Sequence, residues 1–185
     1  MSYRALLVGG GVRCGKSAFA LEMANELGPR RVFIATAQAF DQEMAERIHA
    51  HKLERGVEWK TLEEPLELAE AVRDASSQAD VVVIDCLTLW LSNLLLRDDT
   101  DQAVAQQVEG LAQVLRNRSC HVVMVSNEVG MGLVPETPLG RRFRDCAGRA
   151  HQRLARECSE VYVAVLGCIL RLRPGPVELV SGRTG

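Results

Sequence analysis

A glycine-rich segment near the start of the chain constrains its fold more than any other feature. Residues 5–8 form an apolar run typical of a β-strand, and they lead into a segment that matches the pattern G-x-x-x-x-G-K-[ST]. The eight residues of this phosphate loop are Gly10, Gly11, Val12, Arg13, Cys14, Gly15, Lys16 and Ser17. A strand, such a loop and a helix in succession predict a cradle of backbone N–H groups that binds the phosphates of a nucleotide. The plainer alternative is a glycine-rich turn that only joins a strand to a helix.

Two side chains at the end of the phosphate loop have separate expected roles. The ammonium of Lys16 is expected to reach the β- and γ-phosphates of the nucleotide and so to take part in catalysis. The hydroxyl of Ser17 is expected to be a ligand of Mg²⁺ as the helix begins. The loop alone does not indicate which nucleotide is bound.

Composition limits the class of protein. The 185 residues, 47% of them hydrophobic, are enough for one buried core and predict a single domain over residues 1–185. A formal net charge of −2 argues against a surface dedicated to nucleic acid and favours a small anionic substrate. The six cysteines include no C-x-x-C pair, so we expect reduced thiols in the cytoplasm. No stretch approaches about 18 consecutive apolar residues, so neither export nor a membrane span is expected.

Short apolar runs alternate with helical stretches along the chain. The runs lie at residues 5–8, 32–35, 81–84, 122–125 and 161–165. This rhythm predicts an α/β fold in which helices flank a mostly parallel sheet, of the phosphate-loop, RecA-like kind. Phe19, Met23 and Leu27 recur every four residues and predict a helix after the loop, ended by Gly28.

Further elements are expected in the rest of the chain. Asp41 is expected to cap a helix whose Met44 and Ile48 face inward. Other helices are expected after residue 65, from residue 101 towards 116 and from residue 138 to about 157, and the apolar residues 87–96 are expected to be buried. Residues 174–175 separate two short runs, at 168–173 and 177–180, which predicts a C-terminal antiparallel hairpin. Residues 181–185 are expected to form a loose tail.

Asp85 ends the apolar run of residues 81–84 with a carboxylate. An acidic residue at the end of such a strand is expected to hold Mg²⁺ opposite a phosphate loop. The alternative is that Asp85 caps the helix that follows, and the two roles are compatible.

Arg47, His51 and Arg55 fall at positions i, i+4 and i+8 of a predicted helix, which places an imidazole within a cationic stripe. A triphosphate would be attracted there, and the neighbouring positive charges would keep His51 neutral, with a lone pair available to attack phosphorus. Such a cluster can also be a solvated helix face.

Two further segments are candidates for binding. Residues 126–136 follow a predicted strand, are rich in glycine and form an expected loop at the carboxyl edge of the sheet, where α/β proteins bind ligands. A plain connection is the alternative. Four arginines further on can bind phosphate or simply solvate a helix; they are Arg141, Arg142, Arg144 and Arg149.

Taken together, these segments resemble the bifunctional adenosylcobinamide kinase and adenosylcobinamide-phosphate guanylyltransferase family of cobalamin biosynthesis. The likeness extends over nearly the whole chain and includes, besides the phosphate loop, residues 34–36, 43–52, 61–65, 85–88, 126–132 and 144–155. The ordered set is more specific than the phosphate loop alone. It implies phosphorylation of adenosylcobinamide by ATP or GTP, followed by transfer of GMP from GTP to adenosylcobinamide phosphate, with release of pyrophosphate.

The resemblance also implies roles for particular residues. In that family the histidine before the lysine becomes guanylylated, and the matching residue is His51 rather than His49. Expected nucleotide contacts, with Glu63 as the partner of guanine or ribose, come from Thr36, Lys52, Leu53, Glu54, Arg55 and Glu63. Family precedent further implies a homotrimer.

Two positions depart from the family pattern. Cys14 stands where a small hydroxyl residue is frequent, and His151 stands where asparagine is common. The second departure bears on the corrinoid contacts expected in that region. Two other functions stay open from the residues alone: a kinase of another small metabolite in which His51 is structural, and a GTP-binding switch without enzymatic activity. Against the switch, the chain has no N-K-x-D motif for reading guanine.

Overall fold

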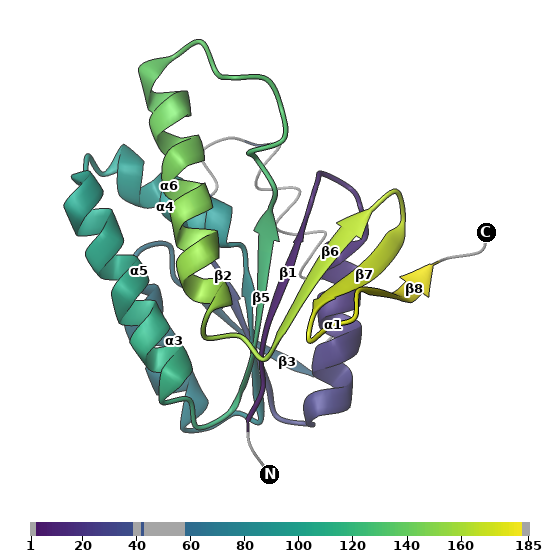
Figure 1. The fold of residues 1–185 in the computed structure, drawn as a ribbon. Helices are drawn as coiled ribbons and strands as arrows, with labels where there is room; N and C mark the ends of the chain where they lie inside the picture. The colour runs from purple at the N-terminus through teal and green to yellow at the C-terminus, as the bar shows by residue number, and fades with distance from the viewer. Residues whose placement is uncertain (1–2, 39–41, 43–57, 183–185) are drawn as a thin grey trace.

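The computed structural model describes residues 3–38, 42 and 58–182. Its centre is an eight-stranded sheet in the order β3-β2-β4-β5-β1-β6-β7-β8 (Figure 1). The strands are β1 (Ala5–Gly10), β2 (Arg31–Ala35), β3 (Trp59–Glu63), β4 (Val81–Asp85), β5 (His121–Asn127), β6 (Glu160–Val165), β7 (Cys168–Arg173) and β8 (Glu178–Gly182). Strands β1 to β6 are parallel, and β7 and β8 continue the sheet as antiparallel strands. The predicted α/β fold with a C-terminal hairpin is confirmed.

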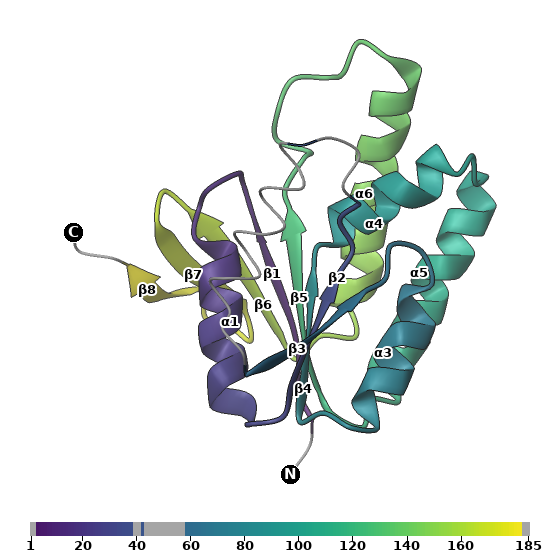
Figure 2. The same ribbon diagram turned by 180° about the vertical axis from the view of Figure 1, so that it is seen from behind.

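Helices cover both faces of the sheet. Helix α1 (Lys16–Leu27) packs on one face. The helices of the other face are α3 (Leu68–Ser76), α4 (Leu87–Leu96), α5 (Asp101–Arg116) and α6 (Pro138–Ala155) (Figures 1 and 2). These bounds agree with the predicted helices after residue 65, from residue 101 and from residue 138. The helix expected after Asp41, with Met44 and Ile48, lies outside the described residues.

The period of two along the strands creates two cores, one on each face. In β4, Val82 and Ile84 belong to the cluster under α3 to α6, whereas Val81 and Val83 face α1. Helix α4 is buried along most of its length, as its apolar residues predict, and its Trp90 donates a hydrogen bond from Nε1 to the Leu66 carbonyl oxygen at 2.8 Å. A sheet buried on both faces explains why the parallel strands appear in the sequence as continuous apolar runs.

Two elements differ from the expectations. Strand β3 has no apolar run in the sequence because it is an edge strand, which among the described strands pairs with β2 alone, and four of its five residues are exposed. Strand β8 includes Ser181 and Gly182, which pair with Ile169 and Cys168 of β7. The prediction of a loose tail from residue 181 is therefore wrong for these two residues, because the unpaired edge of β7 offers backbone partners that composition does not indicate.

Within the part of the chain that the structure describes, no helix has both the length and the apolar composition to cross a membrane.

Candidate active site

The phosphate loop begins where β1 ends and closes onto the first turn of α1. Gly15 precedes the helix with a φ of 94°, a left-handed conformation that glycine adopts without strain. Its carbonyl oxygen accepts a hydrogen bond from the Phe19 N–H at 3.1 Å. At the start of the loop, a Cβ on Gly10 would lie 2.5 Å from the carbonyl oxygen of Ala164 in β6. The loop therefore packs against β6 so closely that only glycine fits at its first position.

Lys16 is folded back into the phosphate loop. Its side chain is buried at the first residue of α1, and its Nζ donates a hydrogen bond to the Gly11 carbonyl oxygen at 2.9 Å. The loop thus holds the positive charge of Lys16 at the N-terminus of α1. A phosphate group binds favourably at such a position. The structure thus places Lys16 in the loop, and its role in phosphate binding stays a prediction.

The parallel strands bring the predicted metal residue to the same edge of the sheet. Asp85 is the last residue of β4 and lies in register with Val125 of β5, while Gly10 of β1 lies in register with Asn127 of β5. The Glu128 N–H donates to the Gly10 carbonyl oxygen at 2.9 Å, which continues the pairing beyond the end of β1. The carboxyl ends of β4, β5 and β1 are therefore neighbours.

Asp85 and Lys16 both influence the buried thiol of Cys86. Burial and, to a smaller extent, the negative charge of Asp85 raise the pKa of this thiol to about 11, while its hydrogen bond with Thr88 and the ammonium of Lys16 oppose the rise. The charges of the carboxylate and the ammonium are therefore both felt at the end of β4.

Ser17 and Asp85 supply oxygen donors of the kind that Mg²⁺ prefers. No cluster of three or more His, Cys, Asp or Glu side chains suited to a metal occurs in residues 3–38, 42 and 58–182. A cation held by one hydroxyl, one carboxylate and substrate phosphates needs no such cluster. The residues present therefore fit Mg²⁺ bound together with a nucleotide.

Thr36 holds the ends of β2 and β4 together. The side chain is fully buried, and its Oγ1 donates to the Cys86 carbonyl oxygen at 2.7 Å and accepts from the Cys86 N–H at 2.8 Å. Its backbone N–H donates to the Asp85 carbonyl oxygen at 3.1 Å, and its carbonyl oxygen accepts from Asn93 Nδ2 at 2.8 Å. Thr36 thus positions Asp85, and its predicted contact with the nucleotide stays a prediction.

Glu63 lies at the same edge of the sheet but far from the phosphate loop. It is the last residue of β3, in register with Ala35 of β2, and its side chain is exposed. Four strand spacings of about 4.8 Å separate β3 from β1, so Glu63 is roughly 19 Å from the loop. A residue at this distance can meet the base or ribose of a nucleotide whose phosphates lie at Lys16, as the resemblance implies.

The end of β5 belongs to a polar network that the motifs alone did not assign. Asn127 Nδ2 donates to Thr88 Oγ1 at 3.2 Å, and Thr88 Oγ1 lies 3.2 Å from the sulfur of Cys86. Glu128 accepts hydrogen bonds from the N–H groups of Gly130 and Met131, at 2.7 and 2.9 Å, and so shapes the loop. Residues 128–137 contain neither helix nor strand, so the loop predicted over residues 126–136 is confirmed from residue 128, whereas Ser126 and Asn127 belong to β5 because they continue its pairing with β1.

His151 connects α6 with the end of β5. Its Nε2 lies 2.6 Å from the hydroxyl oxygen of Ser126, a side chain that is 1% exposed. Burial lowers the pKa of His151, and the nearby Glu128 carboxylate opposes this effect. Ser126 was part of a predicted loop, and His151 was noted only as a departure from the family, so their contact required the fold to be known.

Among the predicted site residues, His51, Lys52, Leu53, Glu54 and Arg55 lie outside the described residues, as does Arg47 of the cationic stripe.

A parallel sheet with a phosphate loop after β1 and a carboxylate at the end of β4 defines a phosphate-loop nucleotide-binding protein. The family model described as "Cobinamide kinase / cobinamide phosphate guanyltransferase" matches residues 6–172. The chain therefore belongs to this family.

Relatives of known name are similar over nearly their whole length. The bifunctional adenosylcobalamin biosynthesis protein CobP of Pseudomonas aeruginosa is 43% identical over 171 residues, which cover 92% of this chain and 98% of that protein. The bifunctional adenosylcobalamin biosynthesis protein CobU of Escherichia coli is 36% identical over 180 residues, covering 91% and 99%. A solved structure from Pyrococcus horikoshii shares the fold with a TM-score of 0.52 at 10% identity and covers 91% of this chain and 85% of its own.

Proposed function

We propose that this protein phosphorylates adenosylcobinamide with ATP or GTP and then transfers GMP from GTP to the resulting adenosylcobinamide phosphate. The observation that carries the proposal is the presence of Lys16, folded into the phosphate loop after β1, and of Asp85, at the end of β4 two strands away, on the same edge of the sheet in a chain of this family. Both reactions need a bound nucleoside triphosphate, and the carboxyl edge of the sheet carries the groups that would bind one.

In the first reaction, residues of this chain position the two substrates and stabilise the negative charge of the phosphate groups. Lys16 binds the β- and γ-phosphates and stabilises the negative charge that develops on the transferred phosphoryl group. Ser17 and Asp85 would hold Mg²⁺, which supplies further positive charge on the phosphate oxygens. Asn127 and Thr88 keep the end of β5 in place beside Asp85.

In the second reaction, a neutral imidazole nitrogen of His51 attacks the α-phosphorus of GTP. A phosphorus–nitrogen bond forms while the bond to the bridging oxygen breaks, and pyrophosphate leaves with that electron pair. A phosphate oxygen of adenosylcobinamide phosphate then attacks the same phosphorus, and the phosphorus–nitrogen bond breaks. The products are adenosylcobinamide-GDP and the free histidine.

The guanine nucleotide is proposed to lie along the carboxyl edge, with its phosphates at Lys16 and its base or ribose at Glu63. The separation of about 19 Å between β1 and β3 supports this orientation. Thr36, Lys52, Leu53, Glu54 and Arg55 complete the proposed nucleotide site.

A cytoplasmic location and a homotrimer are also part of this proposal. The six cysteines are all free thiols, which suits a reducing compartment. The trimer follows from family resemblance, and the mass of the protein in solution, measured by light scattering, tests it.

The decisive experiment is incubation with Mg²⁺ and GTP labelled at the α-phosphate. We expect an acid-labile, hydroxylamine-sensitive label on the wild-type protein and none on His51→Ala, because the adduct is a phosphoramidate. His49→Ala is the matched control and should be labelled like the wild type. Peptide mass mapping should place the added GMP at residue 51.

A second assay separates the two activities. Lys16→Met should reduce phosphate transfer to adenosylcobinamide by more than about 100-fold, because one charge that stabilises the transition state is lost. Phosphate transfer to adenosylcobinamide without any label on His51 would mean that the protein has the kinase activity only. Nucleotide binding without transfer of phosphate or GMP to any corrinoid would favour the GTP-binding switch without enzymatic activity.

A further inference from the structure

Four arginines of α6 are candidates for binding phosphate, and three of them are held by other parts of the protein. Arg141 donates from Nη1 to the carbonyl oxygens of Pro135 and Glu136, at 3.1 and 2.6 Å. Arg142 and Arg149 both bind the Asp101 carboxylate, at 2.6 and 3.3 Å. These side chains fix the loop before α6 and the contact with α5, so they have structural partners.

Arg144 differs from the other three. Its Nη1 is buried and has no hydrogen-bond partner, and the described part of the chain offers no ion pair to its guanidinium. Arg171 also has one buried nitrogen without a partner, but its Nη2 binds Glu178 at 2.6 Å. A buried N–H of a cation costs free energy unless an acceptor meets it, so this group calls for a ligand.

Helix geometry places Arg144 beyond the carboxyl edge of the sheet. Arg144 and His151 are seven residues apart, which is about two turns, so they share one face of α6 and are separated by roughly 10 Å along it. The bond between His151 and Ser126 sets this face against the end of β5. Because α6 runs back towards the start of β6, its earlier residues extend past the strand ends (Figure 1).

Among the described residues, nothing crowds this face of α6 at Gly148. Gly148 lies between Arg144 and His151 on the same side of the helix, and a Cβ built on it would meet no heavy atom within 4 Å. Arg144 therefore lies at one end of this helix face and the Ser126–His151 contact at the other, with Gly148 between them. The Asn127 and Glu128 backbone that borders the phosphate loop follows directly after Ser126.

We propose that Arg144 binds a phosphate group of a substrate at the carboxyl edge of the sheet. A guanidinium presents parallel N–H donors that match two phosphate oxygens, and its charge strengthens both hydrogen bonds. The proposal rests on the proposed function, in which two substrates carry phosphate. Lys16 and the loop already serve the nucleotide, so the phosphate of adenosylcobinamide phosphate is the expected source and the nucleotide is the other.

Kinetics of Arg144→Gln distinguish the two sources. Loss of one charged hydrogen-bonding group should raise KM for adenosylcobinamide phosphate in GMP transfer roughly 10- to 100-fold. KM for adenosylcobinamide in the kinase reaction should not change, because that substrate lacks the phosphate. A rise in KM for ATP or GTP would instead assign Arg144 to the nucleotide.

Two further variants make the experiment interpretable. Arg149→Gln, which removes a guanidinium bound to Asp101 on another side of the helix, is the matched control and should leave every KM unchanged. Arg144→Lys keeps the charge but not the fork of donors, and an intermediate KM is expected. This variant also serves if Arg144→Gln does not fold.

Binding measured by calorimetry gives a readout that does not depend on turnover. Wild type should bind adenosylcobinamide phosphate more tightly than adenosylcobinamide, and Arg144→Gln should lose that difference. Unchanged KM values and unchanged binding in Arg144→Gln, with an active wild type, would overturn the proposal. An inactive wild type would instead refute the proposed function.

Discussion

Two adjacent glycines of the phosphate loop differ in what a side chain would meet. A Cβ on Gly10 would lie 2.5 Å from the backbone oxygen of Ala164 and 2.7 Å from the sulfur of Cys14, whereas a Cβ on Gly11 would meet nothing within 4 Å. The oxygen belongs to a paired strand and cannot move away, so the contact at Gly10 cannot be relieved cheaply.

We therefore expect Gly10→Ala to lower the free energy of unfolding by about 1–3 kcal/mol. Gly11→Ala, the matched control, should change it by less than about 0.5 kcal/mol. Urea denaturation without nucleotide measures both values. Equal losses in the two variants would mean that the contact with β6 does not determine the requirement for glycine.

His151 makes the stability of the protein depend on pH. Burial lowers its pKa in the folded state, so between its ordinary pKa of about 6.5 and the lower folded value the unfolded chain binds a proton that the folded protein does not. Stability is therefore lost as the pH falls below about 6.5.

His151→Asn should remove this contribution, because asparagine does not titrate and can still reach towards Ser126. The variant should lose less unfolding free energy than the wild type between pH 7.5 and pH 5.5. His121, whose pKa burial and the charges of Arg4 and Arg118 also lower, is present in both proteins and cancels in the comparison. Parallel losses would show that His151 is not the responsible group.

At the scale of single residues, the sequence motif was sufficient to predict Lys16 in the phosphate loop and Asp85 at a strand end. It could not assign Thr88, Asn127 or the contact between Ser126 and His151. These groups come together because α4, β5 and α6 pack against one another, and no local pattern of residue types indicates that packing.

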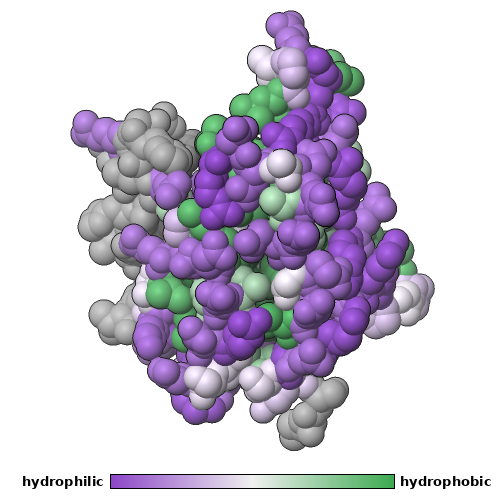
Figure 3. All heavy atoms as spheres, turned by 90° about the vertical axis from the view of Figure 1, so that its left-hand side faces the viewer, coloured by the Kyte–Doolittle hydropathy of each residue, from purple (hydrophilic) through white to green (hydrophobic). Residues whose placement is uncertain are grey.

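Helices α5 and α6 are joined by ion pairs on a largely hydrophilic side of the molecule (Figure 3). Glu157, just after α6, binds Arg116 of α5 at 2.6 Å and Arg153 of α6 at 2.8 Å, and Arg153 also binds Glu109 of α5 at 2.6 Å. The two guanidinium groups lower the pKa of Glu157 to about 2. The network therefore helps to set the angle at which α6 presents its other face to the site.

A carboxylate with a lowered pKa stabilises the fold above its ordinary pKa of about 4.3, and this contribution is lost as the pH falls towards about 2. Glu157→Gln should be less stable than the wild type at pH 7 by roughly 0.5–1 kcal/mol, since the pairs are partly solvated. The difference should shrink steadily between about pH 4.5 and pH 2.

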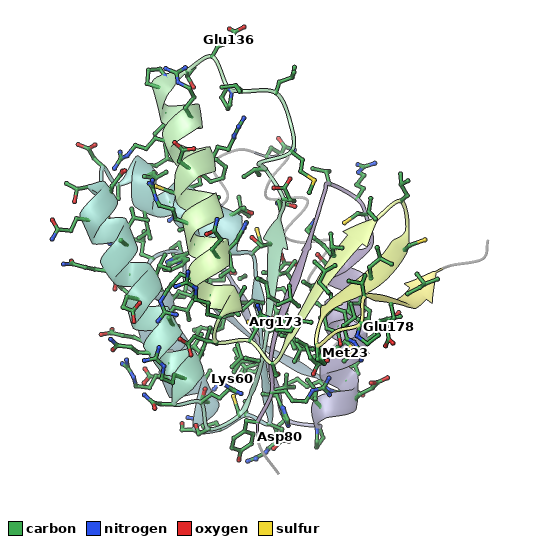
Figure 4. The ribbon with its side chains drawn as sticks, in the orientation of Figure 1. Met23, Lys60, Asp80, Glu136, Arg173 and Glu178 are labelled. Carbon is green, nitrogen blue, oxygen red and sulfur yellow. The ribbon has the colours of Figure 1, made fainter. Side chains whose placement is uncertain are left out.

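The control for this prediction is Glu136→Gln. Glu136 is exposed at the outer tip before α6, at the end of the molecule opposite Asp80 (Figure 4). Its substitution should leave the denaturation midpoint unchanged at every pH. A constant difference between wild type and Glu157→Gln down to pH 2 would contradict the assigned role of the ion pairs.

At the scale of elements, prediction succeeded where burial imposes a pattern. The strands buried on both faces and the amphipathic helices have the expected positions, because apolar runs and periods of 3.6 residues follow directly from burial. Edge strands are stabilised by backbone pairing with one neighbour, and their side chains need not be apolar. The sequence pattern therefore missed strand β3 and the end of β8.

At the scale of the whole molecule, the order of the strands could not be predicted from the chain. Any arrangement of right-handed crossovers satisfies the same alternation of strands and helices. The placement of the phosphate loop and Asp85 on one edge of the sheet was nevertheless predictable, since every parallel strand has its carboxyl end at that edge whatever the order. The distance from Glu63 to the loop, by contrast, depends on the four strand steps that only the topology defines.

The place of β1 in the sheet has a consequence for synthesis on the ribosome. This strand is translated well before its two neighbours, β5 and β6, which end at residues 127 and 165. A nascent chain therefore carries its nucleotide-binding glycines long before it has made the strands that support them. Nucleotide can assist the maturation of this protein only after β5 and β6 have been translated.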